Sequence, residues 1–97
     1  MTTIASASIT AQNTFTTPVR LEGYFNLSIS GMWAATVTVQ RSIDNATWVD
    51  VDTFLANAEE VGFEPELMWY RVGVKTGAFT ASDDINIRLG REDKDRH

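Results

Sequence analysis

The sequence contains no cysteine and only one histidine, His97, which is the last of its 97 residues. The lack of cysteine excludes disulfides, cysteine-ligated zinc and thiol nucleophiles. A histidine at the end of a chain is poorly placed for acid–base catalysis, because catalysis needs a group held beside its substrate. We therefore expect that the protein is not an enzyme.

Long apolar runs, phosphate-binding loops and basic clusters are also missing. No stretch approaches the ~18 consecutive apolar residues of a membrane-spanning helix, and Met1–Ser6 lacks the basic and apolar regions of a secretory signal. The six glycines are scattered and form no nucleotide-binding motif. The formal net charge is -5, so we expect neither nucleic acid nor a membrane as a partner. This charge favours solubility or docking onto a basic surface.

Pairs of carboxylates are present, but their positions favour structural roles. Asp50 and Asp52 lie two residues apart and would share one face of a strand. A hairpin face rarely forms the cleft that a glycosidase places between its two carboxylates. Asp83 and Asp84, beside Asn86, are calcium-type ligands, but their spacing matches no EF-hand loop, and a plain turn is the favoured interpretation. We expect no metal ion and no other cofactor.

Short runs rich in Thr, Val, Ile, Phe and Trp dominate what the sequence does contain, and no long segment has a helical period. This pattern predicts an all-β fold, an antiparallel β-sandwich (immunoglobulin-like or jelly-roll-like) of six to eight short strands. The predicted parts are an N-terminal arm or edge strand over residues 1–17, a β-sandwich domain over 18–90 and a charged flexible tail over 91–97. The predicted strands are 4–9, 15–17, 23–30, 35–43, 47–55, 68–75 and 85–89, with 56–66 as a loop or short irregular strand.

Alternation along the strands predicts which side chains point into the core. Polar residues alternate with apolar ones, so the outward set includes Trp69, Arg71 and Lys75. The predicted inward side chains are Phe25, Leu27, Ile29, Met68, Tyr70, Val72, Val74, Ile85, Ile87 and Leu89.

A hairpin is predicted around Asp44-Asn45-Ala46, because Asp and Asn suit tight turns. Cross-strand partners share a face, so pairing Val39 with Val51 and Arg41 with Val49 gathers the valines in the core and leaves a three-residue loop. A slip by one residue would separate the valines onto opposite faces. In this register the core face holds Val37, Val39, Val49 and Val51, and the other face holds Thr38, Gln40, Trp48, Asp50 and Asp52.

Three tryptophans are many for this length, and the predicted faces place Trp48 and Trp69 outward. Exposed tryptophan is unusual unless something covers it. One interpretation is cover by the protein's own chain, for example by Arg41 or Arg71 stacking on a ring. A second is a protein interface, in which Trp and Arg are enriched. A third is carbohydrate stacking.

Residues Ser42–Trp48 read Ser-Ile-Asp-Asn-Ala-Thr-Trp and resemble the Asp-box of sialidase propellers, although they lack its glycine and are one residue shorter. In such boxes the Ser and Asp stabilise a hairpin turn and perform no chemistry. The resemblance therefore supports the hairpin and not a sialidase.

A second resemblance covers residues 25–89, about two thirds of the chain. Its parts are a strand ending in Gly31, a hairpin (residues 36–51) that begins Thr-Val-Thr-Val-Gln-Arg-Ser, the stretch Gly62–Glu66, a strand Tyr-Arg-Val-Gly-Val-Lys-Thr-Gly (residues 70–77) and a final Ile-Asn-Ile-Arg-Leu-Gly (residues 85–90). Their order is similar to that in small β-sandwich virion proteins of tailed bacteriophages. The turn Asp44-Asn45-Ala46 departs from the glycine-containing turn expected there, which puts the turn type in doubt.

This resemblance implies a structural role on the virion, which composition and spacing do not show. The leading hypothesis is a capsid decoration (cement) protein that is made in the host cytoplasm and binds the major capsid protein of the assembled shell, as a homo-oligomer such as a trimer. The alternatives are a tail- or fibre-associated adaptor that binds another virion protein, and a carbohydrate-binding module. The candidate partner contacts are Trp48, Asp50, Glu59, Glu60, Glu64, Trp69 and Arg71.

Overall fold

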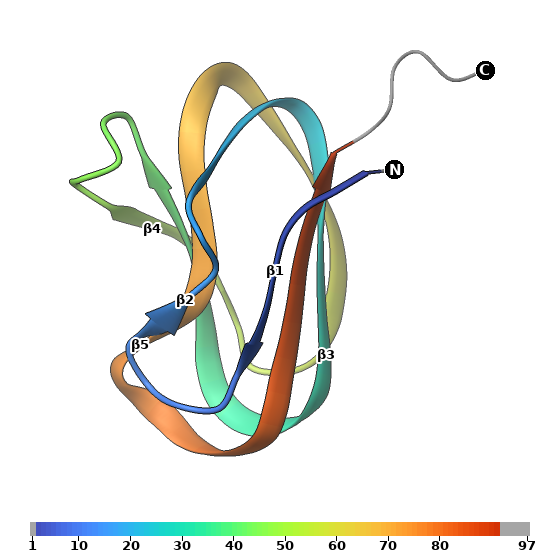
Figure 1. The fold of residues 1–97 in the computed structure, drawn as a ribbon, viewed down its shortest axis with the longest axis vertical. Helices are drawn as coiled ribbons and strands as arrows, with labels where there is room; N and C mark the ends of the chain where they lie inside the picture. The colour runs from blue at the N-terminus through green and yellow to red at the C-terminus, as the bar shows by residue number, and fades with distance from the viewer. Residues whose placement is uncertain (1, 92–97) are drawn as a thin grey trace.

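The structure is a computed structural model that describes residues 2–91, and within them the side chains of all but residues 2–3 and 81–83. It contains five strands, labelled in Figure 1: β1 (Thr2–Ile9), β2 (Thr14–Phe15), β3 (Val19–Ser42), β4 (Val49–Phe54) and β5 (Ala58–Arg91). They form one antiparallel sheet in the order β1-β5-β3-β4, with β2 paired to β5. The predicted all-β antiparallel class is confirmed. No helix able to cross a membrane occurs among the described residues.

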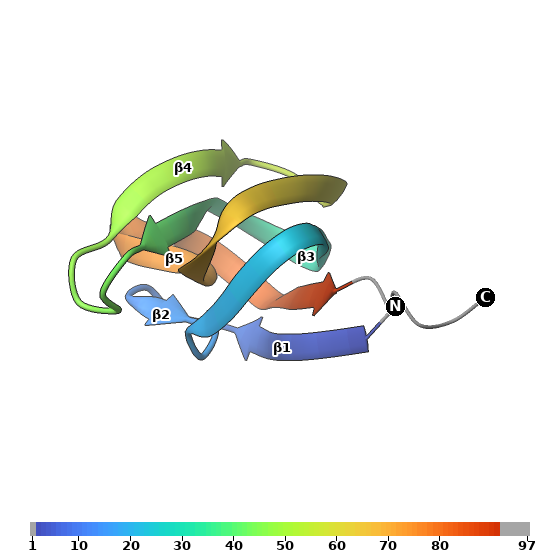
Figure 2. The same ribbon diagram turned by 90° about the horizontal axis from the view of Figure 1, so that it is seen from above.

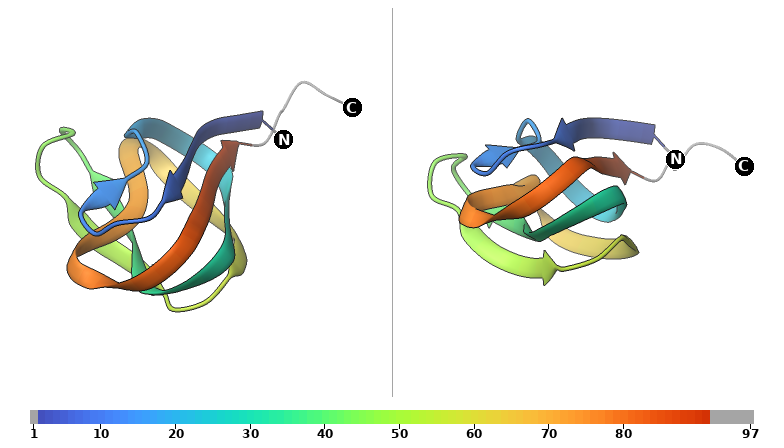
Figure 3. Two further views of the ribbon diagram at one scale, coloured as in Figure 1. Left: turned by 60° about the horizontal axis from the view of Figure 1, so that its bottom comes forward. Right: turned by 90° about the horizontal axis from the view of Figure 1, so that it is seen from below.

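Two of the strands are far longer than predicted, because the chain bends without losing its pairing. β3 has 24 residues and β5 has 34, and β3 pairs with both the beginning and the end of β5. Gly31, just after the predicted strand 23–30, is a bend inside β3, where φ is 115° and pairing continues from Met32 to Asp84. A β-carbon on Gly31 would collide with the backbone carbonyl of Asp84, so glycine permits this approach. Curling of the long strands gives the nearly closed barrel seen in Figure 3.

The core lies between the curled layers and consists of alternate side chains of β3 and β5 with Ile9 of β1. The inward prediction is confirmed for its members on β3 and β5, except that Phe25 is half-buried. The buried apolar side chains are Ile9, Leu21, Leu27, Ile29, Val37, Val39, Met68, Tyr70, Val72, Val74, Ile85, Ile87 and Leu89.

The register between β3 and β4 is correct at one end and wrong at the other. Arg41 pairs with Val49 as predicted, but Val39 pairs with Asp52 instead of Val51. A bulge opposite Val39 and Gln40 accommodates Val51 as an extra residue, which shifts every later pair. The strands end at Ser42 and resume at Val49, so the loop is residues 43–48 and not three residues long.

The edge position of β4 leaves its predicted core valines exposed. Val49 and Val51 are 60% and 47% exposed, so their assignment to the core is wrong. β4 pairs with β3 alone, so its other edge has no partner among the described residues. Asp52, predicted on the outer face, pairs with core-facing Val39 because of the bulge. Gln40 lies on the outer face as predicted, and it is buried there beneath side chains that hydrogen-bond to it.

The N-terminal segment belongs to the sheet. β1 runs along residues 85–91 of β5, and β2 runs along Gly73 and Val74. Thr16 extends this attachment through its backbone N–H, which donates to the carbonyl of Val72 at 2.8 Å. β1 and β2 lie on one side of the molecule and β4 on the opposite side (Figure 2). The predicted charged tail falls, apart from Arg91, outside the described residues.

Candidate functional site

An arginine on the outer face of the sheet contacts two aromatic rings. The guanidinium carbon of Arg71 on β5 lies 4.3 Å from the ring centroid of Phe15 on β2 and 4.4 Å from that of Trp48, just before β4. The positive charge is attracted to the electron-rich ring faces. All three side chains are half-buried. Trp48 is therefore covered in part by the protein's own Arg71, which is the first of the three interpretations offered for it.

Hydrogen bonds continue from Arg71 across this face. Arg71 Nε donates to Gln40 Oε1 at 2.7 Å, and Gln40 Nε2 donates to Asp50 Oδ1 at 2.8 Å. Lys75 Nζ donates to the other Asp50 oxygen at 2.7 Å. The hydrogen bond from Lys75, followed by that from Gln40, lowers the pKa of Asp50, and burial lowers the pKa of Arg71. Each charged group here has a partner, so the cluster joins four strands and leaves no unpaired acid or base for catalysis.

The other two tryptophans also have partners within the chain. The guanidinium carbon of Arg20 lies 5.5 Å from the Trp69 ring centroid. Trp33 Nε1 donates to Asn57 Oδ1 at 2.7 Å. Carbohydrate stacking needs an open ring face, and an arginine lies over one face of Trp48 and of Trp69, which weakens the hypothesis of a carbohydrate-binding module.

Glu64 is 1% exposed, and its prediction as a surface contact is wrong. Arg41 binds its carboxylate through two nitrogens, Nε at 2.6 Å and Nη2 at 2.7 Å. The Tyr70 hydroxyl donates to the same carboxylate at 2.6 Å, and the Glu66 backbone N–H donates at 3.1 Å. A charge can be buried when it is paired and hydrogen-bonded in this way. Its neighbours in sequence, Glu59 and Glu60, remain exposed.

These contacts shift the pKa values of the whole group. The hydrogen bond from Arg41 is the main reason that the pKa of Glu64 falls to about 2, against the opposing effect of burial. Burial, followed by the hydrogen bond to Glu64, raises the pKa of Tyr70 to about 12. The pKa of Arg41 is raised, chiefly by Glu64. At neutral pH the group is thus a fixed ion pair with a neutral tyrosine, which is a structural arrangement.

The turn before β4 is held by the side chains that resemble an Asp-box. Ser42 Oγ accepts the backbone N–H groups of Asp44 at 3.2 Å and Asn45 at 2.9 Å. One Asp44 oxygen accepts the N–H groups of Ala46 and Thr47, both at 2.9 Å. The hydrogen bonds from Thr47 and Ala46 are the largest causes of the lowered pKa of Asp44. Ser42 and Asp44 therefore stabilise the hairpin, as the resemblance implies.

Asn45 replaces the glycine expected in this turn, and its φ is 60°. Asparagine and glycine tolerate this left-handed conformation, whereas a β-branched residue is strained there by about 1–2 kcal/mol. We expect Asn45→Gly to change the free energy of unfolding by less than about 0.5 kcal/mol, and Asn45→Val to lower it by about 1–2 kcal/mol. Urea denaturation of the two variants checks this, and equal stability of both would contradict the left-handed turn.

Four exposed apolar side chains form what we call the apolar patch. Tyr24 and Phe63 are 56% and 57% exposed, and their ring centroids lie 4.8 Å apart. Val61, two residues before Phe63 on β5, is 75% exposed, and Val51 lines the same cavity as Val61. Contiguous exposed apolar surface marks interaction sites in soluble proteins. The apolar patch is therefore the strongest candidate for a partner contact.

A cavity of about 160 Å³ opens beside the apolar patch, between β4 and residues 58–62 of β5. We call this gap the seam. No pairing joins β4 to β5 within the described residues, so the barrel is open there. Core side chains form the floor of the cavity, and the carboxylates of Asp52 and Glu60 also line it. The lining residues are Phe25, Leu27, Val39, Val51, Asp52, Phe54, Glu60, Val61, Gly62, Tyr70 and Leu89.

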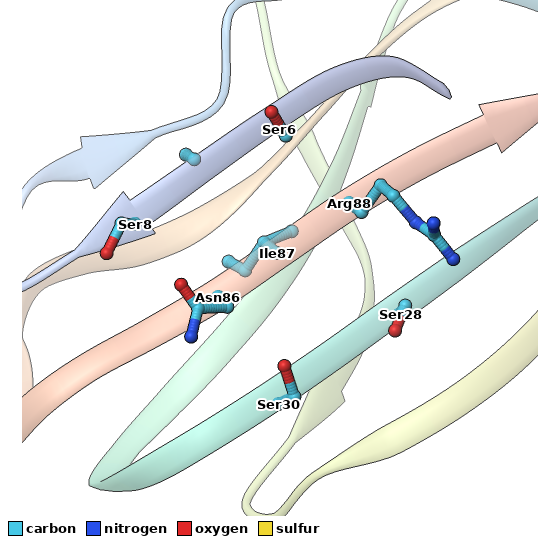
Figure 4. Close-up of a pocket in the computed structure, with 8 residues that line it drawn as sticks. Ser6, Ser8, Ser28, Ser30, Asn86, Ile87 and Arg88 are labelled. Carbon is cyan, nitrogen blue, oxygen red and sulfur yellow. The ribbon is translucent and has the colours of Figure 1, made fainter. Parts of the chain in front are cut away.

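A second hollow of about 570 Å³ is a broad groove on the outer face of β1, β5 and β3 (Figure 4). Its small side chains leave the groove open, and Arg88 is the charged residue among them. Ser28 donates to the Glu59 carboxylate at the edge of this face. Serine needs an adjacent base to act as a nucleophile. No histidine lines the groove, and the carboxylates that its serines contact, Glu59 for Ser28 and Asp84 for Ser8, are not among its lining residues. Its lining residues are Ser6, Ala7, Ser8, Ser28, Ser30, Asn86, Ile87 and Arg88.

The residues considered for calcium do not form a recognisable site. Asp84 accepts hydrogen bonds from Asn86 at 3.3 Å and from Ser8 at 3.5 Å, and the Asp83 side chain lies outside those the structure describes. Among the described residues, no group of three or more acidic or histidine side chains is arranged to hold a metal ion. Comparison with protein-family models, curated proteins and solved structures gives no match.

The structure thus divides the predicted contacts into separate places. Trp48, Asp50 and Arg71 lie together, Glu59 lies beside Ser28, and Glu60 lies at the seam. The apolar patch was not predicted. The alternation of polar and apolar residues could have indicated part of it. Tyr24 shares a face with Asn26 and Ser28, so it is an aromatic residue that points outward.

Proposed function

We propose that this chain is a non-enzymatic virion structural protein of a tailed bacteriophage, and that it is a capsid decoration protein binding the assembled shell. The virion assignment depends on the sequence resemblance over residues 25–89. What supports the binding role is a separate observation, namely the apolar patch.

The apolar patch supports binding because its exposure is unfavourable for a chain in water. Burying apolar surface stabilises a contact by roughly 25 cal/mol for each Å² removed from water. Tyr24, Val61 and Phe63 are each more than half exposed, although the same chain buries Leu27 and Leu89 almost completely. A partner that covers the patch would gain this contribution.

Two further features fit an assembly role. The charged groups on the outer face already have partners within the chain, because Lys75 binds Asp50 and Gln40 bridges Asp50 and Arg71. The barrel also exposes strand edges, which are common sites of pairing between proteins. A tail- or fibre-associated adaptor would use the same surface, so the identity of the partner separates the two hypotheses.

The proposed function predicts co-sedimentation with assembled capsids. We expect the Tyr24→Ser/Phe63→Ser variant to remain in the supernatant, with at least a tenfold loss of affinity, because it removes the aromatic pair at the centre of the contact. Sedimentation of purified capsids with each variant measures this.

Met32→Ser is the matched control, since Met32 is 76% exposed and lies outside the apolar patch. It should co-sediment as the unchanged protein does. Binding of the unchanged protein to purified tails and not to capsids would overturn the decoration role and favour the adaptor.

A further inference from the structure

The seam presents two strand edges that have no partner within residues 2–91. β4 pairs with β3 along one edge only. Residues 58–62 of β5 also pair only with β3, through Ala58 to Ile29 and Gly62 to Phe25. Unpaired backbone N–H and C=O groups on a strand edge are a template for an added strand.

The floor of the seam is shaped for an apolar side chain. Its cavity of about 160 Å³ reaches Leu27, Val39 and Leu89, all of them core residues. An apolar protein cavity of ~150 Å³ is large enough to hold benzene. One aliphatic side chain of an added strand therefore fits this space.

The rim of the seam is acidic. Asp52 and Glu60 both line the cavity, and no lysine or arginine does. Neither carboxylate forms an ion pair with a described residue. Asp52 pairs with Val39 and Glu60 with Leu27, so both carboxylates share the face of the sheet that lines the cavity. A partner strand with basic side chains on the same face as its apolar side chain would complement this rim.

A second copy of this chain does not meet that requirement. Pairing β4 with β4 of another copy would bring Asp50 and Asp52 against the same residues, and like charges across a strand pair are destabilising. β1, at the other end of the sheet order, reads Thr-Thr-Ile-Ala-Ser-Ala-Ser-Ile and carries no basic residue. Neither of these strands matches the acidic rim, so a segment of a different protein fits the seam better than a second copy does.

We propose that the seam binds an extended segment of another protein that carries an apolar residue with lysine or arginine two residues before and after it, since every second side chain of a strand lies on the same face. The segment adds a strand to the free edge of β4, places an apolar side chain in the cavity and sets its basic side chains near Asp52 and Glu60. This inference goes beyond the proposed function and does not depend on it, because any protein can supply such a segment.

The probe is the seven-residue peptide Thr-Lys-Thr-Val-Thr-Lys-Thr, in which both lysines share a face with the valine. Titrated into the whole chain at low salt, it should shift the backbone amide NMR signals of residues 49–54 and 58–62. The Asp52→Asn/Glu60→Gln variant should bind it about fivefold more weakly, because each exposed ion pair contributes up to about 1 kcal/mol. Val51→Lys should abolish binding by placing a cation in the seam.

The matched control is Glu59→Gln/Asp84→Asn, which removes two carboxylates whose partners are Ser28 and Ser8 on the serine-lined face. It should bind the peptide as the unchanged protein does. The same peptide with glutamate in place of lysine, and the same peptide with an N-methylated backbone, should not bind. Equal weakening in both double variants, binding of either control peptide, shifts confined to other residues, no shifts at all, or dimerisation of the chain through the seam would each overturn the proposal.

Discussion

Arg41→Ala is expected to lower the free energy of unfolding by about 3 kcal/mol, the lower end of the range for breaking a buried ion pair. The loss is large because Glu64 would keep a charge that is almost completely buried, with only Tyr70 and the Glu66 N–H to satisfy it. It falls at the lower end because the Arg41 side chain is 35% exposed. Urea denaturation at pH 7 measures it.

The double variant Arg41→Met/Glu64→Met is the control for lost charge. Apolar residues of similar volume often replace a buried pair at little cost, so it should be more stable than Arg41→Ala alone. A loss below about 1 kcal/mol in Arg41→Ala would instead match an exposed, solvated ion pair.

The same network makes stability depend on pH in a defined window. The pKa of Glu64 is lowered from 4.5 to about 2 on folding, so the unfolded chain binds the proton more tightly than the folded one. Its contribution is therefore fully present above pH 4.5 and is lost as pH falls from 4.5 towards 2, and it amounts to about 3 kcal/mol. Denaturation at pH 5.5 and pH 2.5 should show a smaller acid loss in Glu64→Gln than in the unchanged protein. Equal losses would contradict the lowered pKa.

Gly73→Ala is expected to destabilise the protein by about 3 kcal/mol, the upper part of the range for overpacking. A β-carbon at Gly73 would lie 2.5 Å from Phe15 Cα and would also collide with the Thr14 carbonyl. These are backbone atoms of β2, so no side-chain rotation relieves the collision. β2 would leave the sheet, and the contact between Phe15 and Arg71 would be lost with it.

Gly77→Ala separates this steric effect from a general effect of replacing glycine. An added β-carbon at Gly77 meets no atom within 4 Å, but φ there is 85°. Its cost should be limited to the strain of a left-handed alanine, about 1–2 kcal/mol. Thermal unfolding of both variants checks the order, and a larger loss for Gly77→Ala would show that β2 does not pack tightly over Gly73.

The sequence predicted the parts of the fold that depend on alternation. Tyr70, Val72 and Val74 point inward because every second residue of a strand faces the same layer. The bulge at Val51 could not be predicted, since it depends on how β3 and β4 twist around each other. One extra residue there placed Asp52, and not Val51, opposite Val39.

The candidate site could likewise be predicted only in part. Trp48, Asp50 and Arg71 were all predicted to point outward, and stacking of Arg71 on a tryptophan ring was one of the stated alternatives. The burial of Glu64 could not be predicted, because its partner Arg41 lies 23 residues away and is brought to it only by the bend of β5. The seam could not be predicted either, because it depends on which strand edges stay unpaired in the folded chain, and local sequence patterns do not determine that.

The continuity of β3 and β5 determines how the protein should unfold. Because the same two strands run through both layers of the barrel, neither layer can open without breaking the other. Unfolding of this central pair should be a single cooperative event, and its amides should share one high level of protection against hydrogen exchange. β1, β2 and β4 each pair with one neighbouring strand only, so they can detach locally. We expect the motions of the native protein to be concentrated in these three strands.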